Sequence, residues 1–152
     1  GYIGCNLESD LRAKKRKHGF NGVLERNNLE LTTLLGDIPS TVGEGRRLTQ
    51  ELLVNNPDLD CIYFANDDVA FGGLCYCIEE GIKVPNRVAL AGFNGLSFLQ
   101  GFPGLIATST TQRHDIGRAS AEIITLSLKS SEQPQSRELL MQPIINLGAL
   151  QN

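Results

Sequence analysis

Apolar and polar residues alternate along this chain in blocks, and the blocks predict strands and helices in turn. Five short runs rich in apolar residues, each ended by polar ones, predict strands at residues 2–7, 31–38, 60–65, 88–93 and 105–110. Between them, apolar residues recur at helical spacing, which predicts helices at 10–26, 39–56, 69–81 and 113–129. One or two closing strands are predicted within 137–150.

The order of these elements predicts the fold class. Strands alternate with helices four times, and the strand interiors are nearly continuous apolar runs. Strands of this kind are buried on both sides, as in a parallel sheet whose two faces are covered by helices. We therefore predict an α/β fold of three layers, in which ligands bind at the crevice beyond the carboxyl ends of the strands.

Polar segments follow the first four predicted strands. Their sequences are ESD, GDIPS, NDD and NGLS, and they contain Asp10, Asn66 and Asn94. Asn and Asp side chains offer both hydrogen-bond donors and acceptors, which suits a polyhydroxylated ligand. The apolar run VALAGF ends on Asn94 where a core residue could have stood, which predicts that this amide faces the ligand crevice.

Composition and charge narrow the class of protein. The chain has 152 residues, of which 41% are hydrophobic, and a net charge of −3, as expected for one compact domain that does not bind polyanions. Its basic cluster at 12–18 is typical of a solvated helix face. Four cysteines without a CxxC pair, no apolar span and no signal peptide favour a cytoplasmic protein. Because the chain opens without Met directly into a strand, we expect a piece of a longer protein.

The segment NDD has the sharpest local chemistry. Asp67 or Asp68 could cap the third predicted helix, because a carboxylate at a helix N-terminus is stabilised there. Alternatively, both could bind Mg²⁺ together with Asp10, as in a receiver or phosphotransfer domain. No glycine-rich phosphate loop of the type GxxxxGK[ST] accompanies them, so capping is favoured and no metal site is predicted.

Arg16 is the basic residue of the first helix whose position is most informative. It lies one turn before Phe20, which is predicted to be buried, and shares a face with Arg12. Arg16 is then either an exposed cation or a bidentate donor to a diol or a carboxylate.

Four segments taken together resemble one family, the lac repressor and purine repressor family of bacterial transcription regulators. The segments are RKHGFNGVL, ANDDVAFGGL, GIKVPNRVALAGFNG and ATSTTQRHDIGRASAEII, and they span nearly the whole chain. The chain is identified as a member of this family, whose ligand-sensing core is a periplasmic-binding-protein-like type I lobe. Within it, NDD, AGFNG and TQR resemble the branch that regulates gluconate utilisation.

The resemblance implies roles for individual residues. Effector contacts fall on Arg16, Asn66 and Asn94, and Asp10 is a further candidate ligand residue. Ile38 stands where relatives often have an aromatic residue that stacks on the ligand. Ile38 can offer only apolar contact. Many relatives have Asp where this chain has Asn94, and a neutral amide avoids repulsion with a sugar acid. Arg113 would then bind the carboxylate of the ligand.

The resemblance also implies how the chain divides. Residues 1–95 would form most of the C-terminal ligand-binding lobe. Residues 96–135 would be a crossover strand and helix of the N-terminal lobe, and 136–152 would return. The DNA-reading helix-turn-helix and the rest of the N-terminal lobe would lie outside the chain. Without that lobe, the helix at 113–129 is expected to pack elsewhere, exchange with a neighbour or be disordered.

An apolar stripe on the third predicted helix raises the question of a partner. Phe71, Leu74, Cys75 and Ile78 make it wider than coverage of a sheet requires, which predicts a homodimer interface. The alternative is that all four residues cover the sheet.

We therefore predict a sensor and not an enzyme, with no cofactor. It would bind a sugar or sugar acid and form a homodimer. It would bind operator DNA through an N-terminal helix-turn-helix and would not contact a membrane. Two alternatives remain: a periplasmic sugar-binding protein of the same fold, and a Mg²⁺-dependent receiver domain using Asp10, Asp67 and Asp68.

Overall fold

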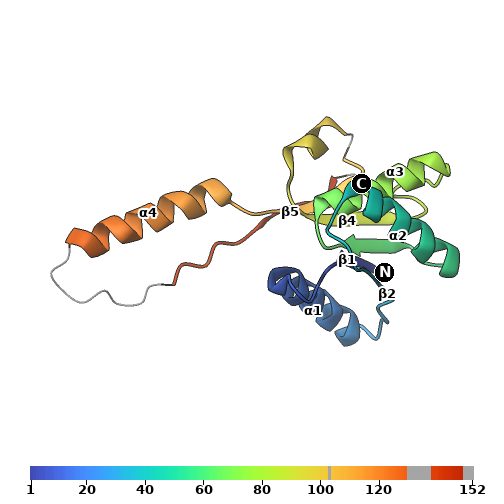
Figure 1. Ribbon diagram of the computed structural model, residues 1–152, viewed down its shortest axis with the longest axis horizontal. Coiled ribbons are helices and arrows are strands. Elements are labelled where there is room, and N and C mark those ends of the chain that lie inside the picture. Colours follow the sequence, from blue (N-terminus) through green and yellow to red (C-terminus); the bar gives the residue numbers. More distant parts are fainter. Residues whose placement is uncertain (103, 130–137, 149–152) are drawn as a thin grey trace.

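The structure is a computed structural model that describes residues 1–102, 104–129 and 138–148. Figure 1 shows a compact body and one helix that projects from it. The elements, in chain order, are β1 (Tyr2–Cys5), α1 (Leu11–Arg26), β2 (Thr33–Gly36), α2 (Val42–Asn55), β3 (Cys61–Phe64), α3 (Asp67–Glu79), β4 (Ala89–Asn94), η1 (Ser97–Gly101), β5 (Ile106–Thr110), α4 (Arg113–Lys129) and β6 (Ile144–Asn146).

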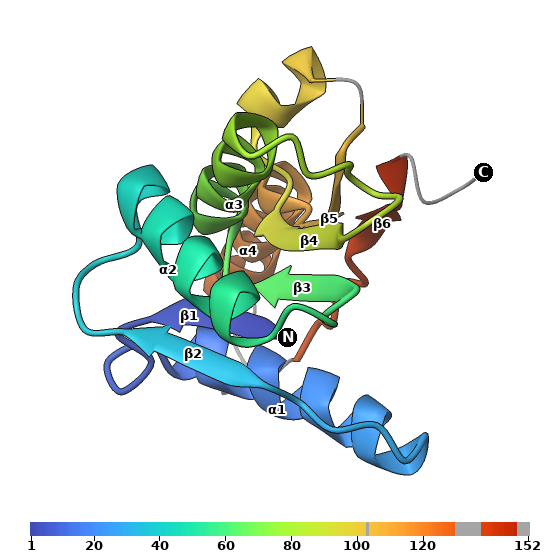
Figure 2. The same cartoon turned by 90° about the vertical axis from the view of Figure 1, so that its right-hand side faces the viewer.

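The strands form one six-stranded sheet in the order β2-β1-β3-β4-β5-β6. The pairs from β2 through to β5 are all parallel, and only β6 is antiparallel to its neighbour β5. Figure 2 shows α1 on one face of the sheet and α2 and α3 on the other. The predicted α/β fold of three layers is confirmed, and the parallel strands all end at the same edge of the sheet.

Side-chain caps fix where the helices begin. Asp10 caps α1 by accepting hydrogen bonds from the backbone N–H groups of Arg12 and Ala13. Thr41 caps α2. The cap of α3 is Asn66, and not Asp67 or Asp68 as predicted, because its side-chain oxygen reaches the N–H three residues on, at 3.0 Å.

The larger part of the core lies between the sheet and helices α2 and α3. It contains Leu48, Phe64, Leu74 and Leu90, which are at most 1% exposed. A smaller buried cluster lies on the side of α1 and consists of Tyr2, Leu7, Ala13 and Ala65. In the described residues, no helix is both long enough and apolar enough to cross a membrane.

The predicted division of the chain is wrong for its fifth strand. β5 pairs in register with β4 over five residues, from Leu90 opposite Ile106 to Asn94 opposite Thr110, so it belongs to the same sheet as residues 1–95. β6 returns to this sheet, while α4 lies away from it and none of the helix's residues, all of which are described, is buried (Figure 1). The predicted boundary between 135 and 136 lies outside the described residues.

Candidate functional site

The carboxyl ends of the strands gather most of the predicted ligand residues at one edge of the sheet. Ile38 lies two residues beyond β2, Asn66 lies two residues beyond β3, and Asn94 is the last residue of β4. Ile38 is 51% exposed, which leaves it free for the apolar contact expected of it. Arg113 begins α4 just after β5.

Arg16 reaches this edge from α1. Its Nη2 donates a hydrogen bond of 2.9 Å to the backbone carbonyl of Ala65, at the end of β3. The guanidinium carbon lies 4.1 Å from the centre of the Phe93 ring, which is a cation–π contact. Within the described residues, its buried Nε has no hydrogen-bond partner. Arg16 is therefore a fixed cation at the strand ends and not a freely solvated one.

Phe93 is a site residue that sequence reasoning missed. It lies directly before Asn94 and supports the guanidinium of Arg16. The signal was available in the sequence, because alternate residues of a strand face opposite sides of its sheet. Leu90 faces the larger core, so Phe93, an odd number of positions away, faces the side of α1.

Asp10 and Asn66 each cap a helix, Asp10 at the start of α1 and Asn66 at the start of α3. The backbone hydrogen bond from Ala13 lowers the pKa of Asp10, so this carboxylate is ionised over the neutral range. The side-chain oxygen of Asn66 is occupied by its helix cap. Its amide nitrogen is the group that it can offer as a donor to a ligand.

Asn94 and Arg113 are linked through the backbone. Nη2 of Arg113 donates a hydrogen bond of 2.8 Å to the carbonyl oxygen of Asn94. Asn94 itself has a φ of 123°, a conformation that residues with a Cβ rarely adopt. The structure thus brings Arg113 and Asn94 together.

Asp67 is buried, and its two carboxylate oxygens are used within the fold. One accepts a hydrogen bond of 2.8 Å from the N–H of Leu96, and the other accepts one of 2.7 Å from the hydroxyl of Thr108. Its side chain is 0% exposed. Among the described residues, no group of three or more His, Cys, Asp and Glu side chains is arranged to hold a metal ion. The geometry gives no support to Mg²⁺ binding by Asp10, Asp67 and Asp68.

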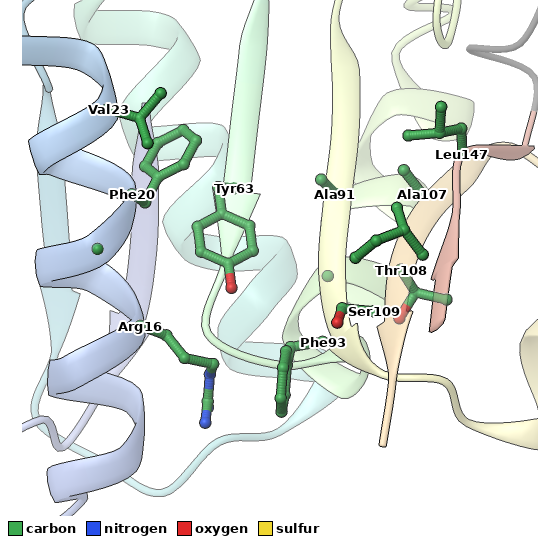
Figure 3. Close-up of a pocket in the computed structure, with 13 residues that line it drawn as sticks. Arg16, Phe20, Val23, Tyr63, Ala91, Phe93, Ala107, Thr108, Ser109 and Leu147 are labelled. Atoms are coloured by element: carbon green, nitrogen blue, oxygen red, sulfur yellow. The ribbon is translucent and has the colours of Figure 1, made fainter. Parts of the chain in front are cut away.

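A cavity of about 410 Å³ lies beside this edge, between α1 and the face of β3, β4 and β5. Figure 3 shows Arg16 and Phe93 at one end of it and Val23 and Leu147 at the other. Its walls are mainly apolar, and burial raises the pKa of the Tyr63 hydroxyl, which therefore stays protonated. The apolar length of this cavity does not suit a polyol, so only the end at Arg16 belongs to the candidate site.

The assignment of one residue, Leu74, to the predicted dimer surface is wrong. Leu74 is 0% exposed, because it packs in the core between α3 and the sheet, so it cannot touch a partner. Ile78, one turn further along, is 61% exposed, and Phe71 and Cys75 are partly exposed. Phe71 also contacts two further exposed aromatic rings, with ring centres 5.2 Å from Phe98 and 5.0 Å from Phe102.

Comparison with known sequences identifies the protein family of this chain. The periplasmic binding protein-like domain family matches residues 1–147, which is almost the whole chain. The chain belongs to this family. The parallel sheet and the polar strand ends are therefore those of a periplasmic binding protein-like domain.

Relatives of this periplasmic binding protein-like domain are transcription regulators, as the resemblance implied. The chain is 31% identical to the HTH-type transcriptional regulator IdnR of Escherichia coli K12 over 131 residues, and 34% identical to the HTH-type transcriptional regulator GntR of Pseudomonas aeruginosa over 136 residues. Each alignment covers 86% of this chain, but 39% and 38% of those relatives. The chain thus spans less than half the length of either regulator.

Solved structures agree. A LacI family regulator from Silicibacter pomeroyi superposes with a TM-score of 0.89 at 40% identity, over 97% of this chain and 45% of that one. The regulator GntR from Chromobacterium violaceum gives a TM-score of 0.82 at 30% identity, over 97% of this chain and 55% of that one. The predicted membership of the lac repressor family is confirmed.

Proposed function

We propose that this domain is the effector-binding part of a transcription regulator, and that it binds a sugar or a gluconate-like sugar acid at the carboxyl ends of its strands. One observation carries the proposal. The guanidinium of Arg16 is held over Phe93 at the ends of β3 and β4, at the same edge as Asn66 and Asn94. A cation and two amides at one edge match the hydroxyl and carboxylate groups of a sugar acid.

The proposed mechanism is a change in the balance between arrangements of the protein, and not catalysis. A ligand held between this lobe and a second lobe would make different contacts in open and closed arrangements. Such coupling between sites is typically worth ~1–3 kcal/mol. The second lobe and the operator-binding helix-turn-helix would come from other parts of the protein, which would act in the cytoplasm. On this proposal α4 packs on that second lobe, since its apolar residues Ile116 and Ile124 are exposed here.

The proposed partner is a second copy of the regulator. The surface would consist of Phe71, Cys75 and Ile78 of α3, Phe98 of η1 and Phe102 directly after η1, without Leu74. Exposed aromatic rings that pack against one another are typical of interface cores. The transporter alternative has no support from the relatives, which are named as transcription regulators.

A thermal shift screen of the full-length regulator tests the ligand. Sugars and sugar acids, including gluconate, are added, and a ligand at 100 times its Kd raises stability by ~2.7 kcal/mol. Arg16→Ala and Asn94→Ala should each remove most of the shift. Arg12→Ala is the matched control, because Arg12 lies one turn earlier on α1 and its side chain is 89% exposed. Full binding by both site variants would refute the proposed site.

A further inference from the structure

The turn after β4 contains a costly backbone conformation at a proposed ligand residue. Asn94 has a φ of 123°, and Gly95 follows with a φ of 65°. A residue with a Cβ keeps such a conformation only where its surroundings impose it, and such residues cluster where ligands are held. The contacts that impose this turn are therefore relevant to ligand binding.

Two consecutive N–H groups after Asn94 are held by buried side chains. The N–H of Gly95 donates to the hydroxyl oxygen of Thr108 at 3.2 Å, and the N–H of Leu96 donates to Asp67 at 2.8 Å. The hydroxyl of Thr108 donates in turn to the second oxygen of Asp67 at 2.7 Å. One carboxylate thus fixes both N–H groups, one directly and one through Thr108.

Helix α3 and strand β4 both accommodate the buried carboxylate of Asp67. Asp67 is the first residue of α3, where the helix N-terminus favours a negative charge. Gly92 lies against it on β4, and a Cβ at that position would stand only 2.4 Å from the Asp67 oxygen. A larger residue at 92 would displace the carboxylate and release the turn.

We propose that Asp67 and Thr108 are positioning residues for the effector: they do not touch it, but they hold the turn that presents Asn94 to it. This inference rests on the proposed function of the site. Thr108 lies on β5, which leads within a few residues to Arg113 and α4. The same network therefore ties the ligand edge to the strand from which the chain leaves the sheet.

A pair of substitutions at one position tests the proposal in the full-length regulator. Thr108→Val keeps the shape of the side chain but leaves the Gly95 N–H and one Asp67 oxygen unpaired, whereas Thr108→Ser keeps the hydroxyl. Calorimetric titration with potassium gluconate should give a Kd about tenfold weaker for Thr108→Val and one within about twofold of wild type for Thr108→Ser. Circular dichroism confirms at the titration temperature that each variant is folded.

A double-mutant cycle separates positioning from a general loss of stability. If Thr108 acts through Asn94, Thr108→Val should add little further loss of affinity in an Asn94→Ala background, with gluconate titrated into the millimolar range. Should Thr108→Val fail to fold, Asp67→Asn keeps the volume of the side chain but has a single oxygen, which cannot accept from both the Leu96 N–H and the Thr108 hydroxyl. Asp67→Asn should weaken gluconate binding severalfold when Asn94 is present, but not in an Asn94→Ala background.

The outcomes are distinguishable. Unchanged gluconate affinity in the folded Thr108 or Asp67 variant, or an equal loss with and without Asn94, overturns the positioning role and leaves the proposed function intact. A wild-type protein that binds neither gluconate nor any other sugar or sugar acid of the thermal shift screen overturns both. A loss that depends on Asn94 and is rescued by serine supports the proposal.

Discussion

The two faces of the sheet are built differently, although they share the same strands. On one face, α2 and α3 seal an extensive core, and they approach each other so closely that a Cβ on Gly45 would stand 2.2 Å from a backbone oxygen of Val69. On the other face, α1 is the one helix of the described residues that covers a small cluster, and it leaves the cavity of about 410 Å³ beside it. Arg16 and Phe93 lie on this less filled face.

The difference separates stability from recognition. The face of α2 and α3 provides most of the buried apolar area, which dominates the free energy of folding. The face of α1 supports the cation of the candidate site and contributes fewer buried contacts. Substitutions on the first face should therefore unfold the protein, while those on the second should cost little stability.

The largest effect is expected at the core of the sealed face. Leu74→Glu buries a charge at a position that is 0% exposed, and should destabilise the chain by about 4 kcal/mol or more, enough to unfold it. Ile78→Glu, one turn away and 61% exposed, should change stability by no more than about 0.5 kcal/mol. Urea unfolding followed by circular dichroism measures both.

The same pair of variants also tests the proposed dimer. Sedimentation of the full-length Ile78→Glu variant should show a weakened dimer, because the substitution adds a charge to the proposed surface without damaging the core. An equally stable dimer in this variant would discard the surface. A folded Leu74→Glu variant would contradict the burial of Leu74.

A smaller effect on stability is expected from alanine substitutions of glycines in α1 and α2, the helices on opposite faces of the sheet. Gly45→Ala should destabilise by about 1–3 kcal/mol, because the added Cβ meets the rigid backbone of α3. Gly19→Ala on α1 meets nothing within 4 Å, and should stabilise by about 0.5–1 kcal/mol through helix propensity alone. Gly43→Ala, also unobstructed on α2, controls for propensity in the same helix. Equal urea midpoints for Gly45→Ala and Gly43→Ala would show that the helices do not meet there.

Sequence reasoning recovered the order of the elements, both ends of α4 and the last residue of α1, because apolar runs and helical spacing are local signals. α4 spans the predicted residues 113–129, and α1 ends at Arg26 as predicted. What it could not recover depends on contacts distant in the sequence. The partner of Asp67 is Thr108, 41 residues later, so the segment NDD suggested only capping or metal binding.

The faces of helices were the other weak point. Periodicity showed that α3 has a broad apolar stripe. It did not show that, within this stripe, Leu74 is buried in the core while Ile78 is exposed. On α1, Val23 lies at helical spacing from Phe20 but is 48% exposed, because the neighbouring half of the sheet carries no second helix among the described residues. An apolar stripe predicts that a helix face is covered, but the tertiary fold determines which element covers it.

The smallest effect belongs to the cap of α1, on the less filled face. Asp10→Ala should destabilise by about 1 kcal/mol at pH 7, because two backbone N–H groups lose their acceptor, while Asp10→Asn should be nearly neutral, since Asn caps equally well. The hydrogen bond from Ala13 lowers the pKa of Asp10 below its ordinary value of 3.8. The contribution of the carboxylate is therefore complete above that value and is lost as the pH falls through the lower folded pKa. The urea midpoints of wild type and Asp10→Asn should agree at pH 7, and below about pH 4 the midpoint of Asp10→Asn should be the higher one. A constant difference between the two midpoints across this range would mean that the carboxylate does not cap the helix.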